Sequence, residues 1–429
     1  MSTTLAANDT PASPPRAALL AHRNFRWLLA GGLVSILGDQ FTLVALPWLV
    51  LQITGDALAL GLVLAVMSVP RAVFILVGGA LVDRHSPRGV LMASKLVQFG
   101  LLGLLALTLW FSVLQMWMVY AFALGIGLAT AFSYPAGSAI LPRCLPTELL
   151  RPANGLLMSL GQAMGLLGPV LAGGLIAAFG HRQQGDAQGL ALAFGFDALS
   201  FAFSAWTVAQ LRMNVIAASA AGSRKAGLLS DVAEAMRAFW ADVPLRSVCL
   251  YFAAIAFFVG GPIQVALPVL AQTQLPGGAA SLGLLFAANG AGVLAGMTLS
   301  GVRPGWKLGT LGRTMLAIDA VAGLAFLPFG HIGAVWQGAA LLGALGLLLG
   351  FVRVAVFSWM QKRVPPAILG RTMSLFLFII MGLAPLASAA SGAALRVLSP
   401  AALFMASGAA LLVIVVVGAL FTPIKTVDA

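Results

Sequence analysis

The sequence predicts an all-α membrane protein with twelve transmembrane helices, arranged as two related six-helix bundles. Composition, a series of long apolar runs and an internal repeat predict this fold class. Of the 429 residues, 60% are hydrophobic and 8% are charged, whereas a soluble protein of this size carries roughly 25% charged residues. The long continuous apolar runs also exclude a β-barrel, whose strands alternate polar and apolar residues.

Twelve apolar runs are long enough to span a bilayer core, which takes about 20 residues of helix. The 49 glycines suit close contacts between such helices, because small residues let backbones approach. In chain order, we expect helices at 27–50, 58–82, 90–111, 115–141, 153–179, 189–211, 247–271, 281–301, 309–330, 334–360, 369–396 and 400–421.

These helices divide the chain into five parts, with the longest polar segment between the sixth and seventh runs. Helical spacing at 228–240 predicts an amphipathic surface helix within that segment. The parts are a disordered N-terminus at 1–22, a bundle at 23–211, a linker at 212–246, a second bundle at 247–421 and a tail at 422–429.

Lys and Arg residues concentrate on one side of the predicted helices. We count Lys95 with the loop cations of that side, whereas the other side holds Arg182 and Arg396. The positive-inside rule then places both termini and the linker in the cytoplasm of a multi-pass inner-membrane protein. The net charge of +12 follows from this topology, so it does not indicate nucleic-acid binding.

Short sequences recur between the two halves at an offset of about 220 residues. The tetrapeptide at 44–47 returns at 265–268, and the tripeptide at 60–62 returns at 282–284. The loop at 143–146 is echoed at 362–365. Such a parallel repeat predicts two bundles related by an axis along the membrane normal, as in many transporters.

The loop after the second run reads GALVDRHSPR at 79–88 and resembles the G-x-L-x-D-R-x-G-R-R signature of the major facilitator superfamily. Ser86 and Pro87 depart from that signature. The resemblance implies the major facilitator fold, a monomer, and secondary transport by alternating access. It also implies a conformational latch, in which a carboxylate at a helix end pairs with arginines. The latch residues are Gly79, Asp83, Arg84 and Arg88, with Leu81 also matching.

The fifth run resembles the antiporter-type G-P-x-x-G-G motif, with Ala172 in the first paired glycine position. In the superfamily this motif is associated with exporters. Ordinary packing of small residues is the alternative interpretation. The pattern at 135–154 and 197–201 is also similar to a subgroup that contains enterobactin and macrolide exporters. The residues of the fifth-run motif are Gly165, Gly168, Pro169 and Gly173.

Ionisable residues inside apolar runs are candidates for coupling or substrate contact, because they are costly at membrane depth. Asp39 is central in the first run and Arg71 in the second. Asp39 could take up and release a proton, and Arg71 could bind an anionic substrate. A permanent Asp39–Arg71 ion pair is the alternative, since a nearby cation keeps a carboxylate ionised.

Further polar residues could face a cavity between the bundles. Asp197 and Asp319 fall on runs that the resemblance places outside that cavity, so we expect structural hydrogen bonds for them. The further cavity candidates are Arg353, Gln40, Gln264 and Asn289.

The leading hypothesis is proton-coupled efflux of an amphipathic small molecule, such as a drug, siderophore or metabolite. A lipid or lysolipid flippase on the same fold is the alternative. An enzyme is disfavoured because no nucleophile motif or metal-ligand spacing occurs. No Walker A sequence occurs either, so we do not expect ATP to be the direct energy source. We expect neither a cofactor nor a metal. A channel would not need a two-fold repeat with a latch.

Overall fold

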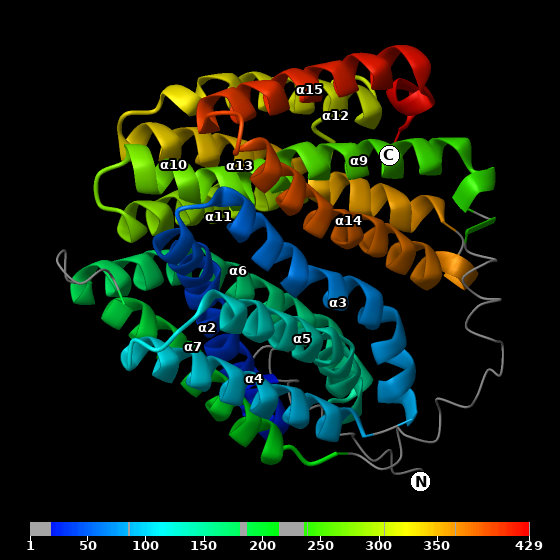
Figure 1. Ribbon diagram of the computed structural model, residues 1–429. Coiled ribbons are helices and arrows are strands. Elements are labelled where there is room, and N and C mark those ends of the chain that lie inside the picture. The colour runs from blue at the N-terminus through cyan, green and yellow to red at the C-terminus, as the bar shows by residue number, and fades with distance from the viewer. Residues whose placement is uncertain are drawn as a thin grey trace, which may run out of the picture.

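The computed structural model describes residues 19–84, 86–180, 187–213, 236–237, 239–303, 305–364 and 366–428 (Figure 1). Side chains are described for these residues except 75–84, 366–371, 374, 375 and 377. Most of the amphipathic helix predicted at 228–240 and most of the predicted disordered N-terminus therefore lie outside the described residues. All described elements are helices.

Six long helices form the N-terminal half, and each of them overlaps one predicted run. Five of them begin earlier than predicted, and α5 begins one residue later. Pro87 begins the third helix, since the first helical position needs no N–H donor. The helices are α2 (Arg23–Thr54), α3 (Ala57–Arg84), α4 (Pro87–Trp110), α5 (Met116–Cys144), α6 (Thr147–Phe179) and α7 (Ala187–Ala209).

The C-terminal half repeats this plan, with two of its spans interrupted. The run predicted at 247–271 contains a π-helical turn between two α-helices, because Pro262 and Pro268 cannot donate to a regular α-helical ladder. The elements are α9 (Val243–Gly261), η2 (Pro262–Ala266), α10 (Leu267–Gln274), α11 (Ala279–Val302), α12 (Leu311–Phe326), η3 (Leu327–His331), α13 (Val335–Arg363), α14 (Pro366–Ala394), α15 (Pro400–Phe421) and η4 (Pro423–Thr426).

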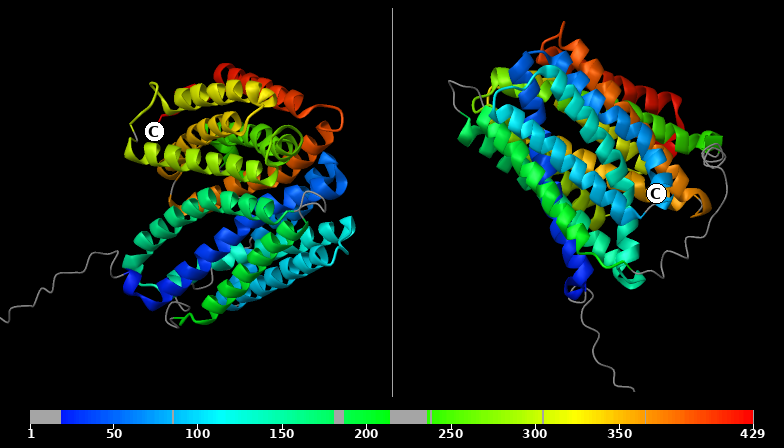
Figure 2. Two further views of the ribbon diagram at one scale, coloured as in Figure 1. Left: turned by 90° about the vertical axis from the view of Figure 1, so that its left-hand side faces the viewer. Right: turned by 60° about the horizontal axis from the view of Figure 1, so that its bottom comes forward.

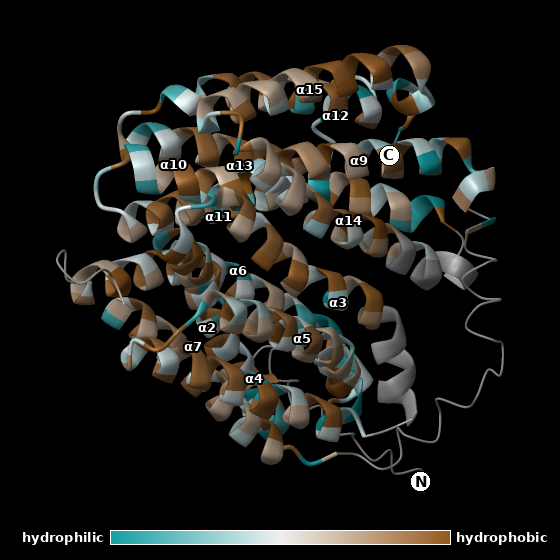
Figure 3. Ribbon diagram, viewed as in Figure 1, coloured by the Kyte–Doolittle hydropathy of each residue, from teal (hydrophilic) through white to brown (hydrophobic). Residues whose placement is uncertain are grey.

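Eleven helices in the described part of the chain are long and apolar enough to cross a membrane. Helix α14 contributes a shorter apolar stretch, Phe378–Ala394. Apolar residues run along most of each helix, and polar residues gather at the ends (Figure 3). The predicted all-α multi-pass class is confirmed, whereas the number of twelve spans stays a prediction.

The two halves lie one on the other (Figure 2) and meet along two helix pairs, α3 with α14 and α6 with α11. Glycines allow close approach at both. Gly61 faces the Ser388 carbonyl oxygen and Gly392, and Gly283 faces the Pro169 carbonyl oxygen. The ribbons of α3 and α14 are closest where α3 begins and α14 ends, and they draw apart toward the other end (Figure 1).

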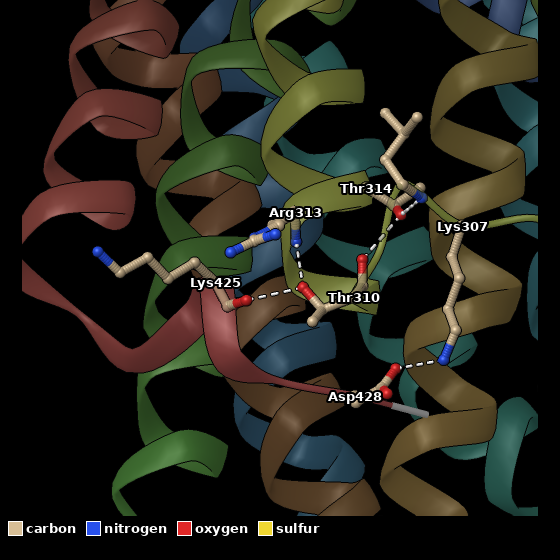
Figure 4. A network of polar contacts seen from close by, with 7 residues as sticks. Lys307, Thr310, Arg313, Thr314, Lys425 and Asp428 are labelled. Carbon is tan, nitrogen blue, oxygen red and sulfur yellow. Dashed lines mark hydrogen bonds and ion pairs between the residues drawn. The ribbon is translucent and has the colours of Figure 1, made fainter.

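The residues predicted as a C-terminal tail form a short helix, η4, that packs against α12. The Gly312 N–H donates to the Val427 carbonyl at 3.0 Å, and the Thr310 hydroxyl donates to the Lys425 carbonyl at 2.7 Å. Lys307 pairs with Asp428 beside them (Figure 4). The tail thus closes one end of the C-terminal half.

Candidate functional site

Asp39 projects from the face of α2 that its two main neighbours leave uncovered. The preceding residue, Gly38, packs against α7, and the following residue, Gln40, packs against Gly168 of α6. Successive helix positions differ by about 100°, so Asp39 points away from both contacts. Its side chain is exposed.

Two cations act on the Asp39 carboxylate from other helices of the same half. Lys95 of α4 has the stronger effect and Arg71 of α3 the weaker. Because both cations belong to helices of the same half, Asp39 points toward the inside of that half. Its side chain is nevertheless exposed, so it lines an opening between the helices. Among the described side chains, no ion pair within 4.0 Å joins Asp39 to Arg71, and the buried Nε of Arg71 has no hydrogen-bond partner. In this conformation the two groups do not form the direct pair considered from the sequence.

Asp197 of α7 is buried against α2 and receives two hydroxyl groups. The Thr42 hydroxyl donates to its Oδ2 atom at 2.5 Å, and the Ser200 hydroxyl lies 3.2 Å from its Oδ1 atom. Gly38 provides the space for this approach, because a Cβ atom there would collide with the Asp197 carboxylate and the Ser200 hydroxyl. Asp197 thus has the hydrogen bonds expected of it and also fixes α2 against α7.

Lys95 completes this arrangement from α4. It is nine residues into the helix, about 12 Å from its start at 1.5 Å per residue. Its Nζ donates to the Ser35 hydroxyl at 2.6 Å and lies 4.6 Å from the centre of the Phe201 ring. The charges of Asp39 and Asp197 both act on it.

Lys95 was counted with the loop cations although it falls within the run predicted at 90–111, and the count missed its contacts inside the bundle. Its position within that run is the sequence signal that could have corrected the count. The groups that meet between these three helices are hereafter the α2–α4–α7 cluster, made of Ser35, Asp39, Thr42, Lys95, Asp197, Ser200 and Phe201.

The corresponding helices of the C-terminal half carry a simpler arrangement. The Tyr251 hydroxyl donates to the buried Asp319 carboxylate at 2.8 Å, which joins α9 to α12. The remaining cavity candidates are dispersed. Gln264 is exposed on the π-helical turn η2, Arg353 is exposed on α13, and Asn289 is half-buried, with its amide 3.4 Å from the Leu342 carbonyl.

The fifth-run glycine motif lies where α6 meets both α2 and the other half of the molecule. Gly168 packs on Gln40, as described above, and the Gly165 carbonyl faces Gly290 of α11. Gly173 packs on the Ala279 carbonyl at the beginning of the same helix. A larger side chain at Gly168 or Gly173 would separate these helices.

The predicted latch is described only in part. Asp83 and Arg84, with Gly79, belong to the last turns of α3, and their side chains lie outside the described residues. Arg88 donates to the carbonyls of Val208, at 3.2 Å, and Ala209, at the C-terminal end of α7. A cation at this position compensates the partial negative charge of a helix C-terminus.

The fold is that of the major facilitator class of membrane proteins. Solved structures with this fold include the nucleoside transporter NupG, with a TM-score of 0.69, 14% identity and coverage of 92% of this chain and 98% of that one. A bacterial homologue of the iron transporter ferroportin in the inward-facing state has a TM-score of 0.68 and 19% identity over 92% and 98%.

Within that class, the family described as transmembrane secretion effectors matches residues 15–429, so the chain belongs to this family. Macrolide efflux protein A of Streptococcus pyogenes is 23% identical over 82% of this chain and 84% of its own. The multidrug efflux pump Tap of Mycobacterium tuberculosis is 24% identical over 84% of each. The protein is a membrane transporter and not an enzyme.

Proposed function

We propose that the protein exports an amphipathic small molecule across the cytoplasmic membrane, using proton influx as its energy source. The observation that carries the proposal is Asp39, an accessible carboxylate that points into the N-terminal half at membrane depth. A carboxylate in such a place can hold a proton in one conformation and release it in another, because its surroundings change as the halves move. The two relatives named for efflux support the outward direction.

Alternating access would proceed by exchanging the end at which the halves meet. In the present conformation they meet where α3 begins, and that end faces outside if the positive-inside prediction holds. The protein would then be open toward the cytoplasm, where both termini would lie and where cargo would enter. A proton taken up by Asp39 from outside would leave to the cytoplasm after the conformational change. The latch residues would stabilise the opposite, outward-open conformation.

The cargo would bind between apolar walls and a few polar groups. Arg71 and Asp39 of the N-terminal half, with Gln40, provide charge and hydrogen bonds. Gln264 and Arg353 provide them from the C-terminal half. A macrolide is a suitable first probe, since one relative is named for that class and the proposed cargo is amphipathic.

The test is gradient-driven transport of a labelled macrolide and a panel of amphipathic drugs by the purified protein in liposomes. The wild-type protein should concentrate at least one probe when a pH gradient is imposed. Asp39→Asn should lose this accumulation but keep gradient-independent exchange of the same probe, because binding remains while proton coupling is lost. Undiminished accumulation by Asp39→Asn would sink the proton role.

Asp319→Asn is the matched control. It neutralises another carboxylate in a membrane helix, and its amide oxygen can still accept the Tyr251 hydrogen bond. We expect near-wild-type coupling from this variant. Failure of the wild-type protein to move any probe of the panel would contradict the proposed cargo class.

A further inference from the structure

Lys95 is a cation inside the helix bundle that the proposed mechanism does not use. The long apolar stem of a lysine near a helix end normally lets its ammonium group extend to the membrane surface. Lys95 does not, because its ammonium group donates to Ser35 on α2 and lies over the Phe201 ring of α7. Its position is therefore fixed by contacts with both neighbouring helices.

The contacts of Lys95 bring its charge close to both carboxylates of the cluster. Ser35, which accepts from the ammonium group, is one helical turn before Asp39, and residues four apart lie about 5–6 Å from each other on a helix face. Phe201 is likewise one turn after Asp197. Lys95 thus lies between the two acids, and both act on its charge.

The position of Lys95 affects the net charge of the cluster. Asp39 from α2, Asp197 from α7 and Lys95 from α4 together carry one excess negative charge. Arg71 of α3 supplies a second positive charge, which acts on Asp39 more weakly than Lys95 does. Loss of the Lys95 charge would therefore leave the carboxylates with an excess negative charge. Such a charge is unfavourable in a low-dielectric region, and proton uptake by a carboxylate relieves it.

Resting on the proton-coupled function above, we propose that Lys95 is the fixed counter-ion of the coupling site. By favouring the ionised carboxylates, it sets the pH at which the site binds its proton. Lys95 acts through Asp39 and Asp197 and is a positioning residue; it does not itself carry the transported proton.

The test compares Lys95→Gln, which removes the charge, with Lys95→Arg, which keeps it. Macrolide exchange and gradient-driven accumulation are measured in liposomes from pH 5 to pH 9. Loss of a neighbouring opposite charge raises the pKa of a carboxylate by about one unit or more. The pH of half-maximal accumulation should therefore move upward by about one unit in Lys95→Gln and stay near the wild-type value in Lys95→Arg.

A double variant and a milder variant keep the test decisive. Lys95→Gln combined with Asp39→Asn should behave as Asp39→Asn alone, because Lys95 acts through that carboxylate. If Lys95→Gln does not fold, Ser35→Ala, which removes only the hydrogen bond to the ammonium group, should shift the profile upward by a smaller amount. Lys307→Gln, which neutralises a lysine at the end of the C-terminal half, is the control and should leave the profile unchanged.

The outcomes separate this inference from the function it rests on. A wild-type protein without pH dependence, or an active Asp39→Asn, contradicts proton coupling itself. A pH-dependent wild type with an unshifted profile in Lys95→Gln overturns only the role of Lys95. Loss of accumulation in Lys95→Arg also overturns it, since a counter-ion tolerates arginine whereas a proton carrier does not.

Discussion

At the scale of single residues, the close approach of α2 to α7 depends on the missing side chain of Gly38. A Cβ atom there would meet the Asp197 carboxylate and the Ser200 hydroxyl. Both groups are held by hydrogen bonds, since the carboxylate accepts from Thr42 and the Ser200 hydroxyl donates to the Asp197 carbonyl, so neither can move without loss. The same contact positions Asp39, the next residue along α2.

Gly38→Ala should lower the thermal unfolding midpoint of the purified protein and weaken transport. Overpacking a tight contact costs about 1–3 kcal/mol, and displacement of Asp197 would add to it. Gly32→Ala is a matched control in the same helix, because a Cβ at Gly32 meets nothing within 4 Å. Equal midpoints for the two variants would contradict the role of Gly38 as a close-contact residue.

The sequence identified the charges that stand alone in apolar runs and missed the one near a run's edge. Asp39 and Arg71 are conspicuous because nothing else in their runs is ionised. Lys95 was counted with the loop cations because it lies near the start of its run, and only the three-dimensional contacts reveal its partners. The meeting of Lys95 with Asp197 joins positions about 100 residues apart, which hydropathy alone cannot predict.

At the scale of elements, apolar run length predicted each long helix, but not its internal irregularities. The π-helical turn η2 arises from the placement of Pro262 and Pro268 within one span. The short helix η4 was predicted as a simple tail because its four residues are too few to carry a periodic signal. Its conformation comes from contacts with α12, so sequence alone could not supply it.

Removing η4 should destabilise the C-terminal half. Ending the chain at Thr422 deletes two hydrogen bonds to α12, each contributing about 1 kcal/mol, and exposes the site of the fully buried Ile424, worth about 1.5–3 kcal/mol. We expect a lower unfolding midpoint in detergent for the truncated chain. Removing Asp428 and the last residue alone should change little, because exposed ion pairs contribute about 0–1 kcal/mol.

A point substitution tests the same contact without shortening the chain. Gly312→Ala would place its Cβ against the Ile424 carbonyl, whereas Gly301→Ala, its control, meets nothing within 4 Å. Gly312→Ala should lower the midpoint in the full-length protein and have no further effect in the truncated one. An equal loss in both backgrounds would show that the substitution acts elsewhere than on η4.

At the scale of the whole molecule, the two halves are joined at one end by an ion pair as well as by glycine contacts. Arg396 after α14 donates to the Asp56 carboxylate before α3 at 3.0 Å. Asp56 is five residues before Gly61 and Arg396 is four residues after Gly392, so the ion pair lies beside the contact between these two glycines. Asp56 also accepts from the Leu58 N–H at 2.8 Å, which caps the start of α3. Opening this end of the molecule requires the pair to separate.

Neutralising this pair should favour the conformation in which that end is open. The hydrogen bond from Arg396, followed by that from Leu58, holds the pKa of Asp56 below its ordinary value. A lowered pKa means that the pair stabilises the closed end at every pH above the ordinary range near 3.9, and that this contribution is lost only as the pH falls through the lowered value. From pH 5 to pH 8 the pair is thus constant, and a pH dependence of transport in that range must come from elsewhere.

Asp56→Asn should therefore raise the labelling rate of single cysteines introduced near the beginning of α3 and the end of α14, equally at pH 5 and pH 8. High salt should produce part of the same effect in the wild-type protein, because Arg396 is exposed and Asp56 is partly exposed, so dissolved ions screen their attraction. Exchanging the two charges, with Asp56→Arg and Arg396→Asp, should restore slow labelling.

Asp428→Asn is the control, since its Lys307 pair joins elements of one half only. Faster labelling at pH 5 than at pH 8 in the wild type, abolished by Asp56→Asn, would show that this pair, rather than Asp39, responds to protons.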